Sequence, residues 1–304
     1  MNNICFSLNR VLSSQDIVSK LASLFSDGDK LFEVISRYSY LSNTGTTHTQ
    51  PNSDLVILIT PFLAYHGITE NDIYSLARKA AITDGASELI SRLNRRAWSV
   101  YCITSSYKQY AVHLTQRLSI FSQNVACTSF PLDELSAKLN KDDFNYVKTL
   151  ESQILDRYPV DDDWIKKNIS SFYRKILPDT SFTTLLEQIE PMDSEHKIKA
   201  LEHFSELSGQ NLSDWIAIGS SSTDFQMLDA VDKAGGLSIA FNAQENTLSH
   251  ATLGLASTNL DDLWPVIDLW GKSKRTAVEN YVKKLEQNKG KNTGGTFHWL
   301  TGKK

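Results

Sequence analysis

Hydroxyl side chains follow three segments that the sequence predicts as short strands. Ser7 lies at the end of the first, Thr104 follows the second, and Ser220 follows the third. In an open parallel sheet the carboxyl ends of the strands meet at one edge, where ligands bind. Lys197 precedes the third strand and adds a positive charge. Because hydroxyl and ammonium groups both donate hydrogen bonds, this set predicts a site for a phosphate or carboxylate group.

These segments belong to a chain in which short apolar strands alternate with amphipathic helices. We expect strands at residues 3–8, 98–103, 124–130, 215–218, 237–241 and 253–256. We expect helices at residues 14–25, 31–38, 87–94, 108–118 and 197–207. Residues 55–59 are all apolar and fit a buried strand or a buried helix equally well. The alternation predicts an α/β fold with a doubly wound, mostly parallel sheet.

Short motifs follow one another in a characteristic order. They are Thr104-Ser-Ser-Tyr107, then Lys197, then Gly219-Ser-Ser-Ser-Thr-Asp224, and finally Gly235-Gly236 with Phe241-Asn242. This series resembles the haloacid dehalogenase-like (HAD) superfamily of phosphohydrolases, most of all a branch from archaea and some anaerobic bacteria. In that branch the corresponding motifs read Ser-Thr-Ser-Tyr, a lysine, and roughly Gly-Asp-Ser-x-Thr-Asp.

The resemblance covers about residues 4–270 and implies a Rossmann-like core with helical cap insertions. Residues 32–38 and 61–67 also resemble the first cap of the branch. The implied organisation is a core at 1–12, 84–130 and 190–270, a first cap at 13–83, a second cap at 131–189, and a basic C-terminal helix and tail at 271–304.

The acidic residues that carry catalysis in this superfamily are replaced at the matching positions. Ser7 stands at the nucleophilic aspartate, Asn9 at the acid/base, and Ser220 at the first aspartate of the fourth motif. The resemblance implies Mg²⁺ bound by the first and last of these and by a backbone carbonyl. Because Mg²⁺ prefers anionic oxygens, we expect no tight metal binding and no phosphoaspartate route. Residues 1–12 contain no Asp or Glu, so a shifted alignment would not restore them.

We therefore expect a protein that has lost phosphatase catalysis and binds an anionic ligand or a protein partner without hydrolysis. The expected anion contacts are Ser7, Thr104, Ser105, Lys197, Ser220 and Ser221. Asp16 and Asp224 are expected to organise the adjoining loops, although Asp16 also fits the start of a helix. A pocket that is retained only as part of the fold, without a ligand, is a further interpretation.

Two other classes of function stay open. An active hydrolase would use Ser7 as nucleophile and Lys197 as base, a pairing known on other folds. A scaffold would use the basic helix at 275–285 and an exposed Trp299, although Trp299 could instead fold back onto the core. Residues 271–304 contain nine Lys or Arg against two Glu.

Composition excludes several further classes. The 304 residues are 41% hydrophobic and 22% charged, which is ordinary for a folded domain and excludes wholesale disorder. No apolar run reaches membrane-spanning length, and the N-terminus lacks the features of a secretion signal. The net charge of −4 gives no case for nucleic acid. Three separated cysteines and scattered histidines predict a reducing cytoplasm and no metal site.

Overall fold

The computed structural model describes residues 2–43, 54–243, 245–287 and 295–300. Seven strands form one sheet in the order β3-β2-β1-β4-β5-β6-β7, in which every pair is parallel except β6 with β7. The strands are β1 (Asn3–Phe6), β2 (Ser99–Tyr107), β3 (Val125–Thr128), β4 (Trp215–Gly219), β5 (Leu237–Phe241), β6 (Leu253–Ala256) and β7 (Thr296–Trp299). The predicted doubly wound, mostly parallel α/β fold is thus confirmed.

Helices cover both faces of this sheet. They are α6 (Ala86–Arg95), α7 (Lys108–Arg117), α12 (Ser194–Ser208), α13 (Phe225–Lys233), α14 (Glu245–Leu248) and α15 (Trp264–Gln287), with single 3-10 turns at Ser122–Asn124, Leu212–Asp214, Ser222–Asp224 and Leu260–Leu263. Alternate residues of a strand point to opposite faces. Cys5 therefore packs with Leu201 of α12, whereas Ile4 and Phe6 belong to the larger core that contains Leu89 of α6.

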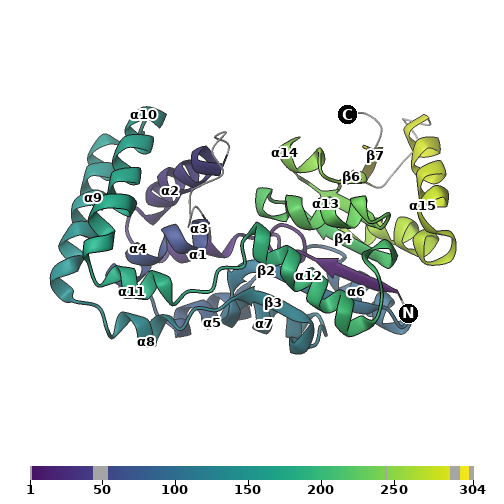
Figure 1. Ribbon diagram of the computed structural model, residues 1–304, viewed down its shortest axis with the longest axis horizontal. Coiled ribbons are helices and arrows are strands. Elements are labelled where there is room, and N and C mark those ends of the chain that lie inside the picture. The colour runs from purple at the N-terminus through teal and green to yellow at the C-terminus, as the bar shows by residue number, and fades with distance from the viewer. Residues whose placement is uncertain (1, 44–53, 244, 288–294, 301–304) are drawn as a thin grey trace.

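Two insertions leave the sheet, one after β1 and one after β3. The first contains α1 (Ile17–Ala22), α2 (Gly28–Asn43), α3 (Leu55–Leu58), α4 (Thr60–Tyr65) and α5 (Glu70–Lys79). The second contains α8 (Leu132–Ser136), a 3-10 turn (Lys141–Asp143), α9 (Phe144–Arg157), α10 (Asp162–Trp164), π-helical turns at Ile165–Ile169 and Phe172–Ile176, a 3-10 turn (Leu177–Asp179) and α11 (Phe182–Glu187). Figure 1 shows α2, α4, α9 and α10 beside the sheet, and we call α1–α4 with α9–α11 the helical lobe.

Single β-bridges close the base of each insertion, Ser13 with Ile82 and Ser129 with Glu190. The insertions also bind each other across the helical lobe. Arg37 of α2 pairs with Asp162 of α10 at 2.6 Å, and His66 after α4 contacts Glu151 of α9 at 2.9 Å. Each pair joins one insertion to the other, so the two insertions are in direct contact within the helical lobe.

The segment at 55–59 is helical rather than a strand. The side chain of Asp54 accepts a hydrogen bond from the backbone N–H of Val56 and so caps the start of α3. Pro61 lies at the beginning of α4, where a missing N–H is tolerated.

Two other expectations require correction. Strand β2 continues to Tyr107 because Thr104 and Tyr107 still pair with β3, so Thr104-Ser-Ser106 lies within an irregular strand end instead of a turn after it. Trp299 is only 3% exposed, because β7 adds an antiparallel strand to the edge of the sheet. The exposed Trp299 of the scaffold interpretation is therefore wrong. Residues 288–294 and 301–304 of the predicted tail lie outside the described residues.

Candidate functional site

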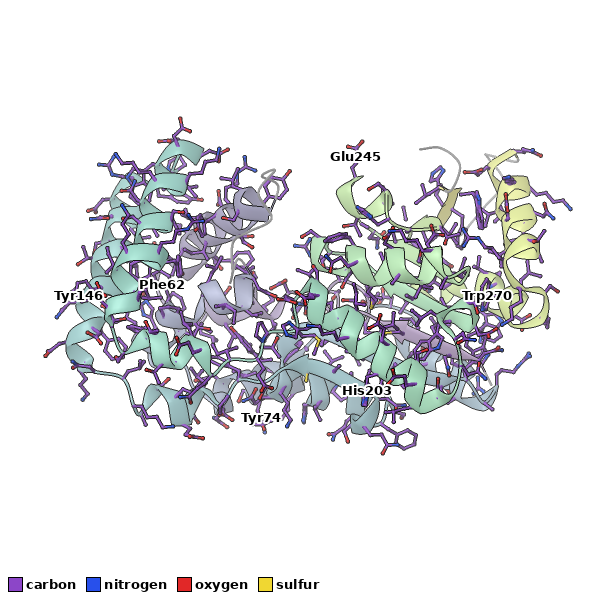
Figure 2. All side chains as sticks on the ribbon, viewed as in Figure 1. Phe62, Tyr74, Tyr146, His203, Glu245 and Trp270 are labelled. Carbon is purple, nitrogen blue, oxygen red and sulfur yellow. The ribbon has the colours of Figure 1, made fainter. Side chains whose placement is uncertain are left out.

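A cleft of about 1450 Å³ lies where the helical lobe faces the carboxyl ends of β1 and β4. The sheet side contributes a polar floor, made of Ser7, Asn9, Arg10, Ser105, Ser220, Ser221, Ser222 and Thr223. Residues of α1, α2, α3 and α10 form the opposite wall. Figure 2 shows Glu245 of α14 on the rim of the sheet side and Phe62 within the helical lobe. This is the edge at which the sequence predicted a site.

Some of the predicted site residues line the cleft, whereas others are buried away from it. Ser7, Asn9, Ser105, Ser220, Ser221 and Asp16 all line the cleft. Thr104 and Lys197 are each only 1% exposed, and Asp224 is fully buried. None of these three lines the cleft. The Oγ1 atom of Thr104 instead accepts a hydrogen bond from the backbone N–H of Ser106 at 3.1 Å.

Lys197 of α12 donates to acceptors in the turn that follows β4. Its Nζ atom donates to Oδ1 of Asp224 at 2.7 Å and to Oγ1 of Thr223 at 2.8 Å. Oδ2 of Asp224 accepts from the backbone N–H groups of Ser220 and Ser221, both at 2.9 Å. The carboxylate of Asp224 is therefore bound to Lys197, the cation that was expected to contact an anionic ligand, and to the backbone amides of Ser220 and Ser221.

Burial of Asp224 alone would raise its pKa, but the charge of Lys197 and the hydrogen bonds from Lys197, Ser221 and Ser220 hold the pKa below its ordinary value. Gly219 is needed beside this carboxylate. A Cβ at Gly219 would lie 2.6 Å from Cβ of Asp224, which is too close for any side chain. The Gly-Ser-Ser-Ser-Thr-Asp sequence therefore folds around its last residue.

Of the three positions that lack the family's acidic groups, Ser220 and Asn9 are joined by a hydrogen bond. Oγ of Ser220 donates to the backbone carbonyl of Asn9 at 3.1 Å. Oγ of Ser106 donates to Oδ1 of Asn9 at 2.9 Å, and the N–H of Ser7 donates to Ile218 at 2.8 Å. The carbonyl two residues after Ser7 therefore already has a donor.

Asp16 lies at the boundary between the cleft and α1. Its Oδ1 atom accepts from the backbone N–H groups of Val18 at 2.9 Å and Ser19 at 3.3 Å. Asp16 is thus the N-cap residue of α1, which begins three residues later than predicted.

Sequence reasoning missed the residues of the helical lobe that line the cleft. Asp54 is the most unusual, because burial raises its pKa to about 6 and its Oδ2 atom has no hydrogen-bond partner among the described residues. Asp29 and Glu33 of α2 also line the cleft, as does Arg10 of the floor. No motif signalled them, since their position depends on how the helical lobe packs over the sheet.

The described residues contain no group of three or more His, Cys, Asp or Glu that could hold a metal ion. At the positions where the superfamily binds Mg²⁺, the chain offers the hydroxyls of Ser7 and Ser220 and the carbonyl of Asn9. These groups do not fit Mg²⁺, because none is anionic and the carbonyl already accepts a hydrogen bond from Ser220.

Within the described part of the chain, no helix has the length and apolar character needed to cross a membrane.

No family model matches the chain, and no curated protein matches it either. Solved structures do match. A gene product of Archaeoglobus fulgidus has a TM-score of 0.83 at 18% identity, over 99% of this chain and 91% of that one. Phosphoserine phosphatase in its apo form has a TM-score of 0.55 at 15% identity, over 87% of this chain and 98% of that one.

A HAD family hydrolase from Salmonella enterica serovar Typhi also matches, with a TM-score of 0.53 at 11% identity, over 80% of this chain and 62% of that one. At these identities the likeness concerns the fold. The chain has the fold of the haloacid dehalogenase-like phosphohydrolases, the superfamily that its motifs resemble.

Proposed function

We propose that this protein has lost phosphoryl transfer and binds a small polar ligand in the cleft without hydrolysing it. The hydrogen bond from Ser220 Oγ to the Asn9 carbonyl carries the proposal. In the superfamily these two positions hold Mg²⁺ together with the nucleophile. Here the Ser220 hydroxyl donates a hydrogen bond to the Asn9 carbonyl, so each satisfies the other and neither attracts a cation.

The alternative of a serine-based hydrolase finds less support. Ser7 would require a base to remove its proton, since a free hydroxyl is a weak nucleophile. The candidate base, Lys197, donates hydrogen bonds to Asp224 and Thr223. Its Nζ atom is engaged by these acceptors and Lys197 does not line the cleft, so it is poorly placed to act as the base.

The floor of the cleft retains hydrogen-bonding groups that a ligand can use. Ser7, Ser105, Ser220 and Ser221 contribute hydroxyls, and Arg10 contributes an exposed guanidinium. An anionic group at this floor stays a prediction, as does a protein partner. The pairing of Lys197 with Asp224 weakens the anionic alternative, because the buried cation is already neutralised.

Titration calorimetry with MgCl2 tests the proposal. We expect no binding by the native chain up to millimolar Mg²⁺, and measurable binding by Ser7→Asp/Ser220→Asp, because that variant restores two carboxylates. Ser7→Asn/Ser220→Asn is the matched control, since it has the same shape without the charge. Saturable Mg²⁺ binding by the native chain that Ser220→Ala abolishes would contradict the proposal.

A further inference from the structure

The charged residues of the cleft are predominantly acidic. The carboxylates that line it are Asp16, Asp29, Glu33, Asp54, Asp162 and Glu245. The guanidiniums that line it are Arg10 and Arg37. The cleft therefore carries a formal charge of −4, which equals that of the entire chain. A concave surface of one sign concentrates ligands of the opposite sign.

Five of these carboxylates have no described cationic partner. The sixth, Asp162, forms an ion pair with Arg37, which donates two hydrogen bonds to it. Asp29 and Glu33 have neutral donors instead: Asp29 accepts from Ser23 Oγ, and Glu33 accepts from the hydroxyl of Tyr158. Neutral donors satisfy the oxygens without removing the charge, so the repulsion among these groups is uncompensated within the described residues.

Asp54 gives a second and independent indication of a ligand. Its Oδ1 atom caps α3, but its Oδ2 atom is sealed from solvent and has no partner among the described residues. A buried acceptor without a donor is destabilising. Burial is the main effect that raises the pKa of Asp54 to about 6; Asp193 and Asp16 act in the same direction, whereas the hydrogen bond from Val56 and the charge of Lys197 oppose it. A positive charge in the cleft beside this carboxylate would oppose the effect of burial.

Apolar side chains also line the cleft. Phe32 and Val34 come from α2, Leu55 and Val56 from α3, and Ile165 from the second insertion. A cleft of about 1450 Å³ is larger than a single ammonium ion requires. A lining that contains both acidic groups and apolar surface complements a chain of methylenes that carries several ammonium groups.

We propose that the cleft binds a linear aliphatic polyamine, with the carboxylate of Asp54 as its principal anchor. The proposal rests on the proposed function, since it names the ligand of the same cleft. The ammonium groups contact Asp54, Glu33 and Asp29 along the helical lobe, and the methylenes lie against Phe32 and Leu55. No covalent step is involved.

Titration calorimetry of the full chain with spermidine tests this inference at physiological ionic strength. We expect saturable binding that Asp54→Asn weakens by on the order of 10- to 100-fold, because the ionic contact between an ammonium group of spermidine and this carboxylate is lost. Asparagine is also a good N-cap residue, so α3 should keep its start. Glu33→Gln is a second variant that retains an acceptor for Tyr158. Glu134→Gln removes an equal charge from an exposed residue outside the cleft and should change the affinity less than twofold.

Four results would overturn the inference. They are no spermidine binding, binding that Asp54→Asn and Glu33→Gln leave unchanged, equal displacement of spermidine by MgCl2 at matched ionic strength, and tighter binding of orthophosphate or phosphoethanolamine. The last would leave the proposed function standing with a different ligand. Hydrolysis of p-nitrophenyl phosphate would instead overturn the proposed function, whatever the result with spermidine.

Discussion

Asp224→Asn tests whether the buried ion pair with Lys197 is structural. The carboxylate accepts from Lys197 Nζ, from the N–H groups of Ser220 and Ser221 and from the Ser221 hydroxyl. Asparagine cannot accept on both sides, so either the ammonium or the amides face an NH2 group. Removing one member of a buried pair costs about 3–5 kcal/mol, because the other charge is left uncompensated.

A loss of this size should be plain in unfolding experiments. For a chain of this length we expect Tm to fall by roughly 5–8 °C, and the urea midpoint to fall with it. Asp229→Asn is the matched control: it removes the same charge from α13, the helix that Asp224 precedes, but its partner Lys233 is exposed, so we expect a loss below about 1 kcal/mol. Lys197→Met/Asp224→Asn should recover part of the loss, because no buried charge remains.

The pH dependence has a definite sign. Since the pKa of Asp224 is lowered in the folded state, its contribution is fully present above the ordinary carboxyl pKa of about 4 and disappears as pH falls through the folded value. The native chain should therefore lose this stability in acid, and the double variant should not. If Asp224→Asn costs no more than Asp229→Asn, the pair is not a buried structural element and Lys197 is available to a ligand.

Three further predictions concern the lobes and the sheet edge. Tyr107→Phe removes a 2.7 Å hydrogen bond from β2 to the carbonyl of Val56. We expect the free energy of unfolding to fall by only about 1 kcal/mol, because Thr60 still donates to that carbonyl. We also expect faster hydrogen exchange in α3, because its link to β2 is lost. Unchanged exchange would contradict this link. Trp299→Ala should cost about 3–5 kcal/mol in urea unfolding, and a loss below 1 kcal/mol would show that β7 is not part of the core. Spermidine affinity should decrease as pH falls through about 6, where Asp54 becomes protonated, and a flat profile in calorimetry would exclude Asp54 as the anchor.

Periodicity and motif order were sufficient to predict the mostly parallel sheet and the edge of it at which Ser7 and Ser220 lie. Ser7 and Ser220 end adjacent parallel strands, and local sequence alone places both at one edge. The predicted strand at residues 98–103 ended too early. Pairing with β3 extends it through Thr104 to Tyr107, and such pairing depends on a strand that lies some twenty residues away.

The direction of side chains could not be predicted in the same way. Lys197 occupies its expected position in the motif order, yet whether it faces the cleft or Asp224 depends on how α12 packs against the loop after β4. Asp54 reaches the cleft only because the helical lobe folds over the sheet. These contacts join residues that are distant in sequence, and no local pattern encodes them.

The most direct test of the central claim is the hydrolysis of p-nitrophenyl phosphate with Mg²⁺. It compares the native chain with Ser7→Asp/Asn9→Asp/Ser220→Asp, which restores the acidic groups at all three positions. We predict no turnover above background for the native chain, because it lacks a nucleophilic carboxylate and anionic metal ligands. Turnover by the native chain that Ser7→Ala abolishes would contradict the account.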